Sequence, residues 1–215
     1  MVDLTVNLIA PSIPGTYTGY WRLRDPGGVP FGITPAGGTF IVKIVVVTGS
    51  SITLLPVVDE SGTIQKNAGP FPDYSVGEAV SDIYHACEAF LSFDITGIPA
   101  KATITEVKIN FKDHIITGDP FDSLGVLNGY ISDYGSKLEP ADFVTGFPEG
   151  NIIDWGSITP LTKIETSPEL KAALQERIGK SRLQLRLQFA GSNGDEVKDR
   201  ITFNNPSLIV TYTVP

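Results

Sequence analysis

Apolar and polar residues alternate with a period of two along most of the chain. The pattern is clearest near the C-terminal end, in the run Leu183, Gln184, Leu185, Arg186, Leu187, Gln188 and Phe189. Because successive side chains of a strand point to opposite faces, this run predicts a half-buried strand. We expect its leucines and Phe189 to face the core, and Gln184 and Arg186 to be exposed.

Shorter runs of the same period, separated by turn residues, predict further strands. They cover residues 2–9, 17–23, 39–47, 52–58, 91–95, 106–112, 126–131, 201–203 and 208–214. Residues 66–77 are rich in Gly and Pro and are expected to form a loop. The pattern restarts after Gly49-Ser50-Ser51, which predicts one segment at 1–48 and a domain at 50–215.

One helix is predicted, at about residues 168–178. Ser167 is a favoured N-cap residue, and Pro168 suits the first helical position. An apolar stripe follows, and Gly179 stands where a helix commonly ends. The predicted fold is therefore all-β, a β-sandwich or jelly roll with one short inserted helix.

The amino-acid composition argues against several classes of function. The 215 residues carry 16 Lys and Arg against 24 Asp and Glu, a formal charge of −8, which argues against nucleic acid as a partner. No apolar run approaches the roughly 20 residues of a membrane span. One Cys excludes an internal disulfide and a Cys-based zinc cage, and two His leave little for a triad.

The N-terminal segment carries several motifs typical of one family. In chain order they are Leu8-Ile9-Ala10-Pro11, Pro14-Gly15-Thr16-Tyr17, Tyr20-Trp21-Arg22-Leu23, Phe31-Gly32 and Val42-Lys43-Ile44. Residues 2–47 resemble the last three strands, E, F and G, of the immunoglobulin-like four-tryptophan domain of autophagy cargo receptors and bacterial surface proteins. The resemblance implies a tyrosine corner at Tyr17 and a partial sandwich without its front half.

A partial sandwich has an uncovered apolar face. Trp21 shares a strand face with Tyr17 and Leu23, which makes it core-facing. With the front half missing, we expect six apolar side chains to be partly exposed: Leu4, Val6, Leu8, Trp21, Ile41 and Ile44.

The longer C-terminal part resembles a second family. Its first motifs are Ala89-Phe90-Leu91-Ser92-Phe93-Asp94-Ile95, Gly97-Ile98-Pro99-Ala100 and Ala102-Thr103-Ile104. The runs 182–189 and 208–212 look like the final strands of the same family. Residues 50–215 look like a DNRLRE-type domain, an extracellular β-sandwich grouped with carbohydrate-binding modules. The resemblance implies an extracellular or cell-surface location, with any signal or precursor region lying upstream of this chain.

Four sets of residues are candidates for a binding or chemical role. Asn193, Asp195 and Asp199 place oxygen ligands in one loop and resemble part of a calcium loop, with a solvated turn as the alternative. Asp119 and Asp122 are weaker metal candidates. Trp155, Tyr130 and Tyr134 offer flat rings to sugars, or else pack in the core. His85 and Cys87 share a strand face, which would suit a metal or a nucleophile, but no third ligand or orienting partner is indicated, and this favours a half-buried His beside a buried thiol.

These observations favour a non-enzymatic extracellular or cell-surface module with a structural or adhesive role. The predicted partners are other copies of the chain, completed by β-strands from a neighbour in a filament or surface layer. The alternatives are a carbohydrate-binding module for a polysaccharide and, less favoured, a secreted hydrolase. Ca²⁺ is the one cofactor that the sequence indicates.

Overall fold

The computed structural model describes residues 7–32, 38–66, 68–79, 85–146, 149–192, 194–195 and 197–214. Contacts divide the chain into two compact units, Met1–Gly49 with Thr213–Pro215, and Ser50–Tyr212. In the described ranges no helix has the length and the apolar composition to cross a bilayer.

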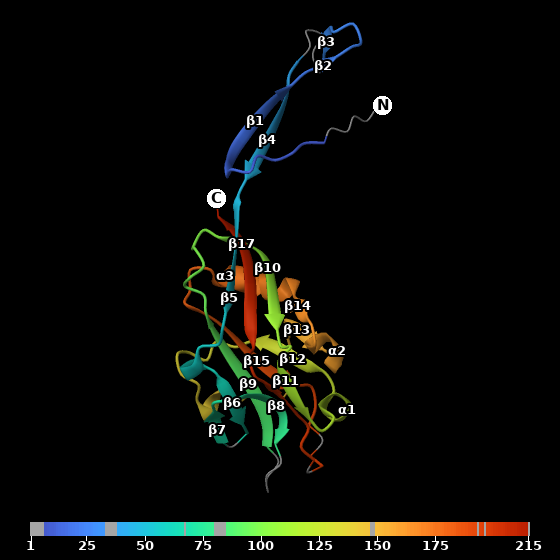
Figure 1. Cartoon of the computed structure of the whole chain (residues 1–215). Coiled ribbons are helices and arrows are strands. Elements are labelled where there is room, and N and C mark those ends of the chain that lie inside the picture. The colour runs from blue at the N-terminus through green and yellow to red at the C-terminus, as the bar shows by residue number, and fades with distance from the viewer. Residues whose placement is uncertain are drawn as a thin grey trace. The chain divides into compact units, whose positions relative to one another are not determined.

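The N-terminal unit is built on one long hairpin (Figure 1). Strand β1 (Gly15–Trp21) pairs antiparallel with β4 (Phe40–Val46), in a register that joins Tyr17 to Ile44 and Trp21 to Phe40. Nearer the tip, β2 (Leu23–Arg24) pairs with β3 (Pro30–Phe31). The strand predicted over 2–9 is not seen at 7–9, which have no regular structure, and its remainder lies outside the described residues.

The tyrosine corner is confirmed. The Tyr17 hydroxyl donates to the Ile13 carbonyl at 2.8 Å, four residues upstream. This bond turns the chain back on itself just before β1 begins, which is the arrangement found at the start of strand F in immunoglobulin-like sandwiches.

The C-terminal unit contains two antiparallel sheets. The first has the order β14-β10-β17-β5, and its strands are β5 (Thr48–Leu54), β10 (Thr103–Asn110), β14 (Ile164–Thr166) and β17 (Ser207–Val214). The second has the order β11-β16-β8-β9-β15-β12-β13, with β6 paired to β9 and to β7. Its strands are β6 (Gly62–Gln65), β7 (Ala68–Phe71), β8 (Tyr74–Ala79), β9 (His85–Asp94), β11 (His114–Thr117), β12 (Leu127–Ile131), β13 (Ile153–Trp155), β15 (Arg182–Phe189) and β16 (Arg200–Phe203).

One apolar cluster joins the two sheets and makes the unit a β-sandwich, as predicted. It takes Phe93 from β9 and Leu187 from β15 on one side, and Ile109 from β10 and Val210 from β17 on the other. Aromatic rings fill the end of this core, where Phe111 stacks on Phe203 with ring centroids 4.3 Å apart.

The predicted helix is confirmed as α3 (Pro168–Arg177), with the Ser167 hydroxyl accepting the Leu170 N–H at 2.9 Å. Leu170 and Leu174 bury its apolar side in the sandwich core. Four short helical segments were not predicted: η1 (Val58–Glu60), α1 (Pro120–Leu124), η2 (Pro140–Asp142) and α2 (Ile158–Leu161). They span three to five residues, too few for a helical period to show.

The loop predicted over 66–77 is wrong, because β7 and most of β8 lie there. Glycine serves the packing of these strands rather than a turn. Gly77 has a φ of 125°, and a Cβ on it would come within 2.2 Å of the Asp199 carbonyl oxygen. Only glycine allows the two backbones to approach this closely.

The prediction for β15 is half right. Its leucines and Phe189 are buried as expected, but Gln184 and Arg186 are also only 3% exposed. Residues 132–146, the covering segment between β12 and β13, lie over the second face of the strand and contribute Leu138 to a small cluster with Ile64 and Phe90. The strand is therefore buried on both faces.

Replacing Leu185 by alanine should lower the free energy of unfolding by about 2–5 kcal/mol, because the side chain is fully buried and leaves a cavity. Chemical denaturation of the two proteins measures the difference. The matched control is Leu55→Ala at an exposed position, which should change stability by about 0.5 kcal/mol or less. Equal losses in both variants would contradict the core position of β15.

Candidate interaction surfaces

The hairpin β1–β4 has apolar side chains on both of its faces. Directly paired residues of an antiparallel sheet point to the same side, so the register defines two faces. The Trp21 face consists of Gly15, Tyr17, Gly19, Trp21, Phe40, Val42, Ile44 and Val46. The Tyr20 face consists of Thr16, Thr18, Tyr20, Ile41, Lys43 and Val45.

The Tyr20 face is open. Tyr20 and Ile41, which are direct partners in the register, are 72% and 67% exposed, and Val45 is 61% exposed. Lys43 is the one charged residue on this face. A patch with an aromatic ring, two aliphatic side chains and one charge is typical of a surface that contacts another protein.

The Trp21 face is covered only in part. Leu8, Ile9 and Pro11 line a groove of about 220 Å³ along it, together with Trp21 and Ile44. The Trp21 ring lies over Gly19, where a Cβ would come within 2.7 Å of the indole Nε1. Even so, Trp21 remains 42% exposed, in line with the partial exposure expected for it.

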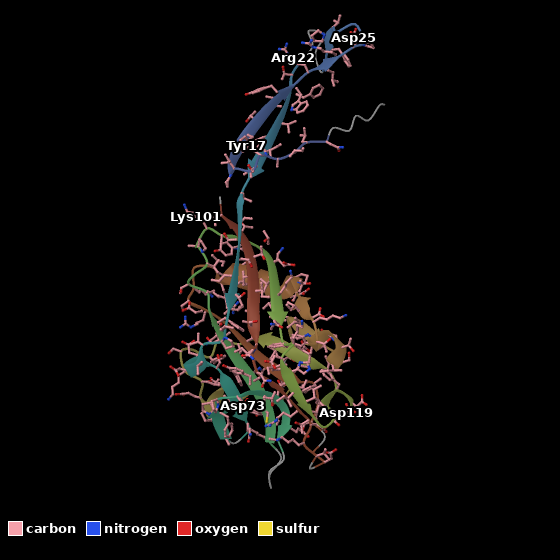
Figure 2. All side chains as sticks on the ribbon, in the orientation of Figure 1. Tyr17, Arg22, Asp25, Asp73, Lys101 and Asp119 are labelled. Carbon is pink, nitrogen blue, oxygen red and sulfur yellow. The ribbon has the colours of Figure 1, made fainter. Side chains whose placement is uncertain are left out.

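The two units differ sharply in charge. Residues 1–49 carry three basic and two acidic side chains, a net charge of +1, whereas residues 50–215 carry 13 basic and 22 acidic ones, a net charge of −9. Arg22 and Asp25 follow Tyr17 along the hairpin (Figure 2), and the Arg22 Nε donates to the Thr39 hydroxyl at 3.2 Å. The apolar hairpin thus belongs to the near-neutral part of a strongly acidic chain.

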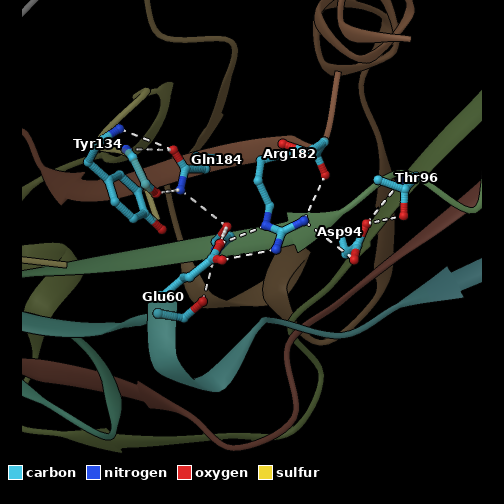
Figure 3. A network of polar contacts seen from close by, with 10 residues as sticks. Glu60, Asp94, Thr96, Tyr134, Arg182 and Gln184 are labelled. Atoms are coloured by element: carbon cyan, nitrogen blue, oxygen red, sulfur yellow. Dashed lines mark hydrogen bonds and ion pairs between the residues drawn. The ribbon is translucent and has the colours of Figure 1, made fainter. Parts of the chain in front are cut away.

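In the C-terminal unit, a row of polar side chains holds the covering segment against the sheet. The Gln184 Oε1 accepts the N–H groups of Tyr134 and Gly135 at 3.1 and 3.3 Å, and its Nε2 donates to the Gly135 carbonyl at 2.6 Å (Figure 3). Farther along β15, the Gln188 amide donates to the Gly146 carbonyl at 2.7 Å. These side chains take the place of a neighbouring strand in pairing with the segment's backbone.

An ion-pair network closes one end of this row (Figure 3). Arg182 donates to both carboxylate oxygens of Glu60, at 2.7 and 3.0 Å, and lies 3.4 Å from Asp94. The Ser92 hydroxyl donates to the same Glu60 carboxylate at 2.7 Å. The hydrogen bond from Arg182 lowers the pKa of Glu60, so this carboxylate stays ionised and ties η1 to β15.

A second ion pair is almost completely buried. Glu88 is 1% exposed, and its Oε1 lies 3.6 Å from the Arg186 Nη1. The Val144 N–H of the covering segment donates to its Oε2 at 3.2 Å, and the Arg186 guanidinium lies 4.9 Å from the centre of the Tyr130 ring. Burial raises the pKa of Glu88 to about 7, although Arg186 acts in the opposite direction.

The three aromatic residues predicted to bind sugars do not form a platform. Tyr130 lies beneath Arg186, and Tyr134 packs edge-on against Phe90 with ring centroids 5.3 Å apart. Trp155 pairs with Leu127 and packs against Phe111 in the main core, on the opposite face of the sheet from Tyr130. The loop position predicted for Trp155 is therefore wrong: it lies in β13 and is 2% exposed.

The predicted calcium site stays a prediction, because Asn193 lies outside the described residues. Asp195 accepts the Val197 N–H at 2.9 Å. Asp199 is buried and accepts the Asp119 N–H at 2.6 Å, which joins β16 to the start of α1. In the described part of the chain no three His, Cys, Asp or Glu side chains are placed to hold a metal.

Cys87 is buried in the sheet, and burial raises the pKa of its thiol to about 12. The thiol is thus protonated at neutral pH, the less nucleophilic form of cysteine. The side chain of His85 lies outside the described part.

The exposed patch of Tyr20 and Val45 was not predicted from the sequence, nor were the ion pairs of Glu60, Glu88 and Arg186. For the hairpin a signal was present, because residues 39–47 are apolar on both faces except at Lys43. For the buried ion pair none was, because Glu88 and Arg186 are far apart in the sequence and only the pairing of β9 with β15 brings them together.

Comparison with known families gave a match that covers the hairpin β1–β4. Residues 1–46 match the sequence model of a family described as the Ig-like domain from next to BRCA1 gene. The match ends at the last residue of β4 and includes the tyrosine corner. Comparison with curated protein sequences gave no match. The immunoglobulin-like match and the sandwich fold are compatible with a structural or binding module.

The pKa of Glu88 predicts an unusual dependence of stability on pH. Because its pKa is raised in the folded state, the carboxyl stabilises the fold fully below about pH 4.5, and this contribution is lost as the pH rises through 7. Between pH 5 and 8 the loss should be about 2 kcal/mol. Denaturation at several pH values should show a flatter profile for Glu88→Gln than for the native chain.

The control for this measurement is Glu176→Gln, at an exposed position on α3. Its profile should follow that of the native chain. If Glu88→Gln also follows the native profile, Glu88 titrates as an ordinary exposed carboxyl and the buried pair is misassigned.

Proposed function

We propose that this chain is a non-enzymatic structural module that assembles with other copies of itself through the hairpin β1–β4. The observation that carries the proposal is the apolar surface on both faces of this two-stranded sheet. An isolated two-stranded hairpin is at best marginally stable in water, and a third element is needed to bury its apolar side chains.

The immunoglobulin-like match supports a β-structured partner. In such a sandwich, strands F and G pair with each other, and F also borders strand C of the same sheet. Strand β1 follows the tyrosine corner and so takes the place of strand F, with β4 as strand G. In the described residues β1 pairs only with β4, which leaves its other edge available to a strand from a neighbour.

The difference in charge supports a second copy as that neighbour. A hairpin unit of net charge +1 meets less repulsion on the acidic C-terminal unit of another copy than two acidic units meet on each other. A contact between unlike surfaces leaves the pair with one unused hairpin and one unused acidic surface, so assembly continues into a polymer.

The finer family resemblances belong to the same proposal. The likeness of residues 2–47 to the four-tryptophan domain and of residues 50–215 to DNRLRE-type domains favours an extracellular or cell-surface location. No specific observation favours carbohydrate binding or hydrolysis, because Trp155, Tyr130 and Tyr134 are engaged in packing.

Sedimentation velocity over a range of protein concentrations tests the proposal. The native chain should form larger species as its concentration rises. The double variant Tyr20→Lys, Ile41→Lys should remain monomeric at concentrations about tenfold higher, because charged side chains on the Tyr20 face resist desolvation. The control Leu55→Lys, Val58→Lys changes two equally exposed apolar residues of the C-terminal unit and should assemble like the native chain.

A native chain that is monomeric at every concentration would overturn self-assembly. So would a Tyr20→Lys, Ile41→Lys variant that assembles as the native chain does. If a monomeric chain is instead retarded in gels that contain polysaccharide, carbohydrate binding replaces the proposal.

A further inference from the structure

The edge strand β11 is short but carries no charged side chain, proline or bulge that would keep another strand from pairing with it. It stands at the end of its sheet and, among the described residues, pairs on one side only, with β16. Ile115 and Ile116 are 56% and 39% exposed, and as successive residues they point to opposite faces. Between His114 and Thr117 there is no charged residue, proline or bulge of the kind that protects an edge.

The other edges of the C-terminal unit differ from β11 in this respect. Asp154 lies in β13, Glu165 in β14 and Pro70 in β7. Strand β5 exposes glycine, serine and threonine along its length. Among these edges, therefore, only β11 combines exposed apolar side chains with the absence of a charge or a proline.

We infer that the β11 edge receives strand β1 from the hairpin of a second copy, an inference that rests on the self-assembly proposed above. Strand addition satisfies the outward N–H and C=O groups of both edges, and side chains on the two faces add specificity. β11 then takes the place beside β1 that strand C has in an immunoglobulin-like sheet.

Charges beside the two strands match. Arg22 directly follows β1, and Asp119 lies two residues beyond the end of β11, at the start of α1 (Figure 2). Asp113 directly precedes β11. Hydrogen bonds from Asn204 and Asn205 lower the pKa of Asp113, so its carboxylate is charged at neutral pH. Arg22 would lie toward the Asp113 end of β11 if β1 adds antiparallel, and toward the Asp119 end if it adds parallel.

The contact joins two different surfaces, the hairpin of one copy and the β11 edge of the next, so the copies associate head to tail. Each copy offers one hairpin and one β11 edge, and a copy bound by its hairpin still has its own edge exposed. This arrangement predicts a linear polymer. Pairing of one hairpin with another hairpin would stop at a dimer.

Two variants and their mixture test the inference by sedimentation velocity. The edge variant Ile115→Lys, Ile116→Lys should be monomeric, while the control Ile164→Lys, Val197→Lys, at similarly exposed positions, should assemble like the native chain. In a mixture with the hairpin variant Tyr20→Lys, Ile41→Lys, the intact hairpin of the edge variant can bind the intact β11 edge of the hairpin variant. The mixture should therefore form dimers and nothing larger.

The outcomes separate this inference from the proposed function. If the edge variant assembles like the native chain while the hairpin variant does not, the hairpin has another partner surface and the assignment of β11 is wrong. If the two variants are monomeric but their mixture forms no dimer, the assignment is also wrong. If the native chain itself never assembles, the proposed function fails together with this inference.

Discussion

A sheet of two strands has two faces and cannot bury either by itself. The two units of this chain differ in how they meet this constraint. In the N-terminal unit, β1 and β4 form a regular antiparallel pair, yet Tyr20 and Ile41 remain on the surface. The tyrosine corner fixes the start of β1 but covers little apolar area. In the described residues the Tyr20 face is left open, so a further element that packs on it would add hydrophobic stabilisation to this unit.

The C-terminal unit meets the same constraint within its own chain. Its central strands β9 and β15 are buried on both faces, by the four-stranded sheet on one side and by the covering segment on the other. Polar side chains do not weaken this second layer, because Gln184 and Glu88 bond to the backbone of the segment. In the described residues the C-terminal unit thus buries its central strands, whereas the hairpin leaves the Tyr20 face open.

Local signals in the sequence predict the local features of the structure. The alternation at 183–189 gives β15, Ser167 and Pro168 give the start of α3, and Tyr17 gives the tyrosine corner. These features depend on residues close together in the chain, whose spacing is visible in the sequence.

Features that depend on distant partners are not visible in that way. Gln184 and Arg186 are buried because a segment about 40 residues earlier covers them. Trp155 and Tyr130 point to opposite faces because of the register between β12 and β13. Alternation shows that a strand has two kinds of face, but not whether another layer covers the polar one.

The most direct test of the account is amide hydrogen exchange along β1 at low and high protein concentration. Alternate N–H groups of β1 bond to β4, and the others point toward the open edge. If another copy adds a strand there, the edge-facing amides should exchange slowly at high concentration and quickly after dilution. Exchange of these amides at the same rate at every concentration would contradict the account, because it would show that nothing binds this edge.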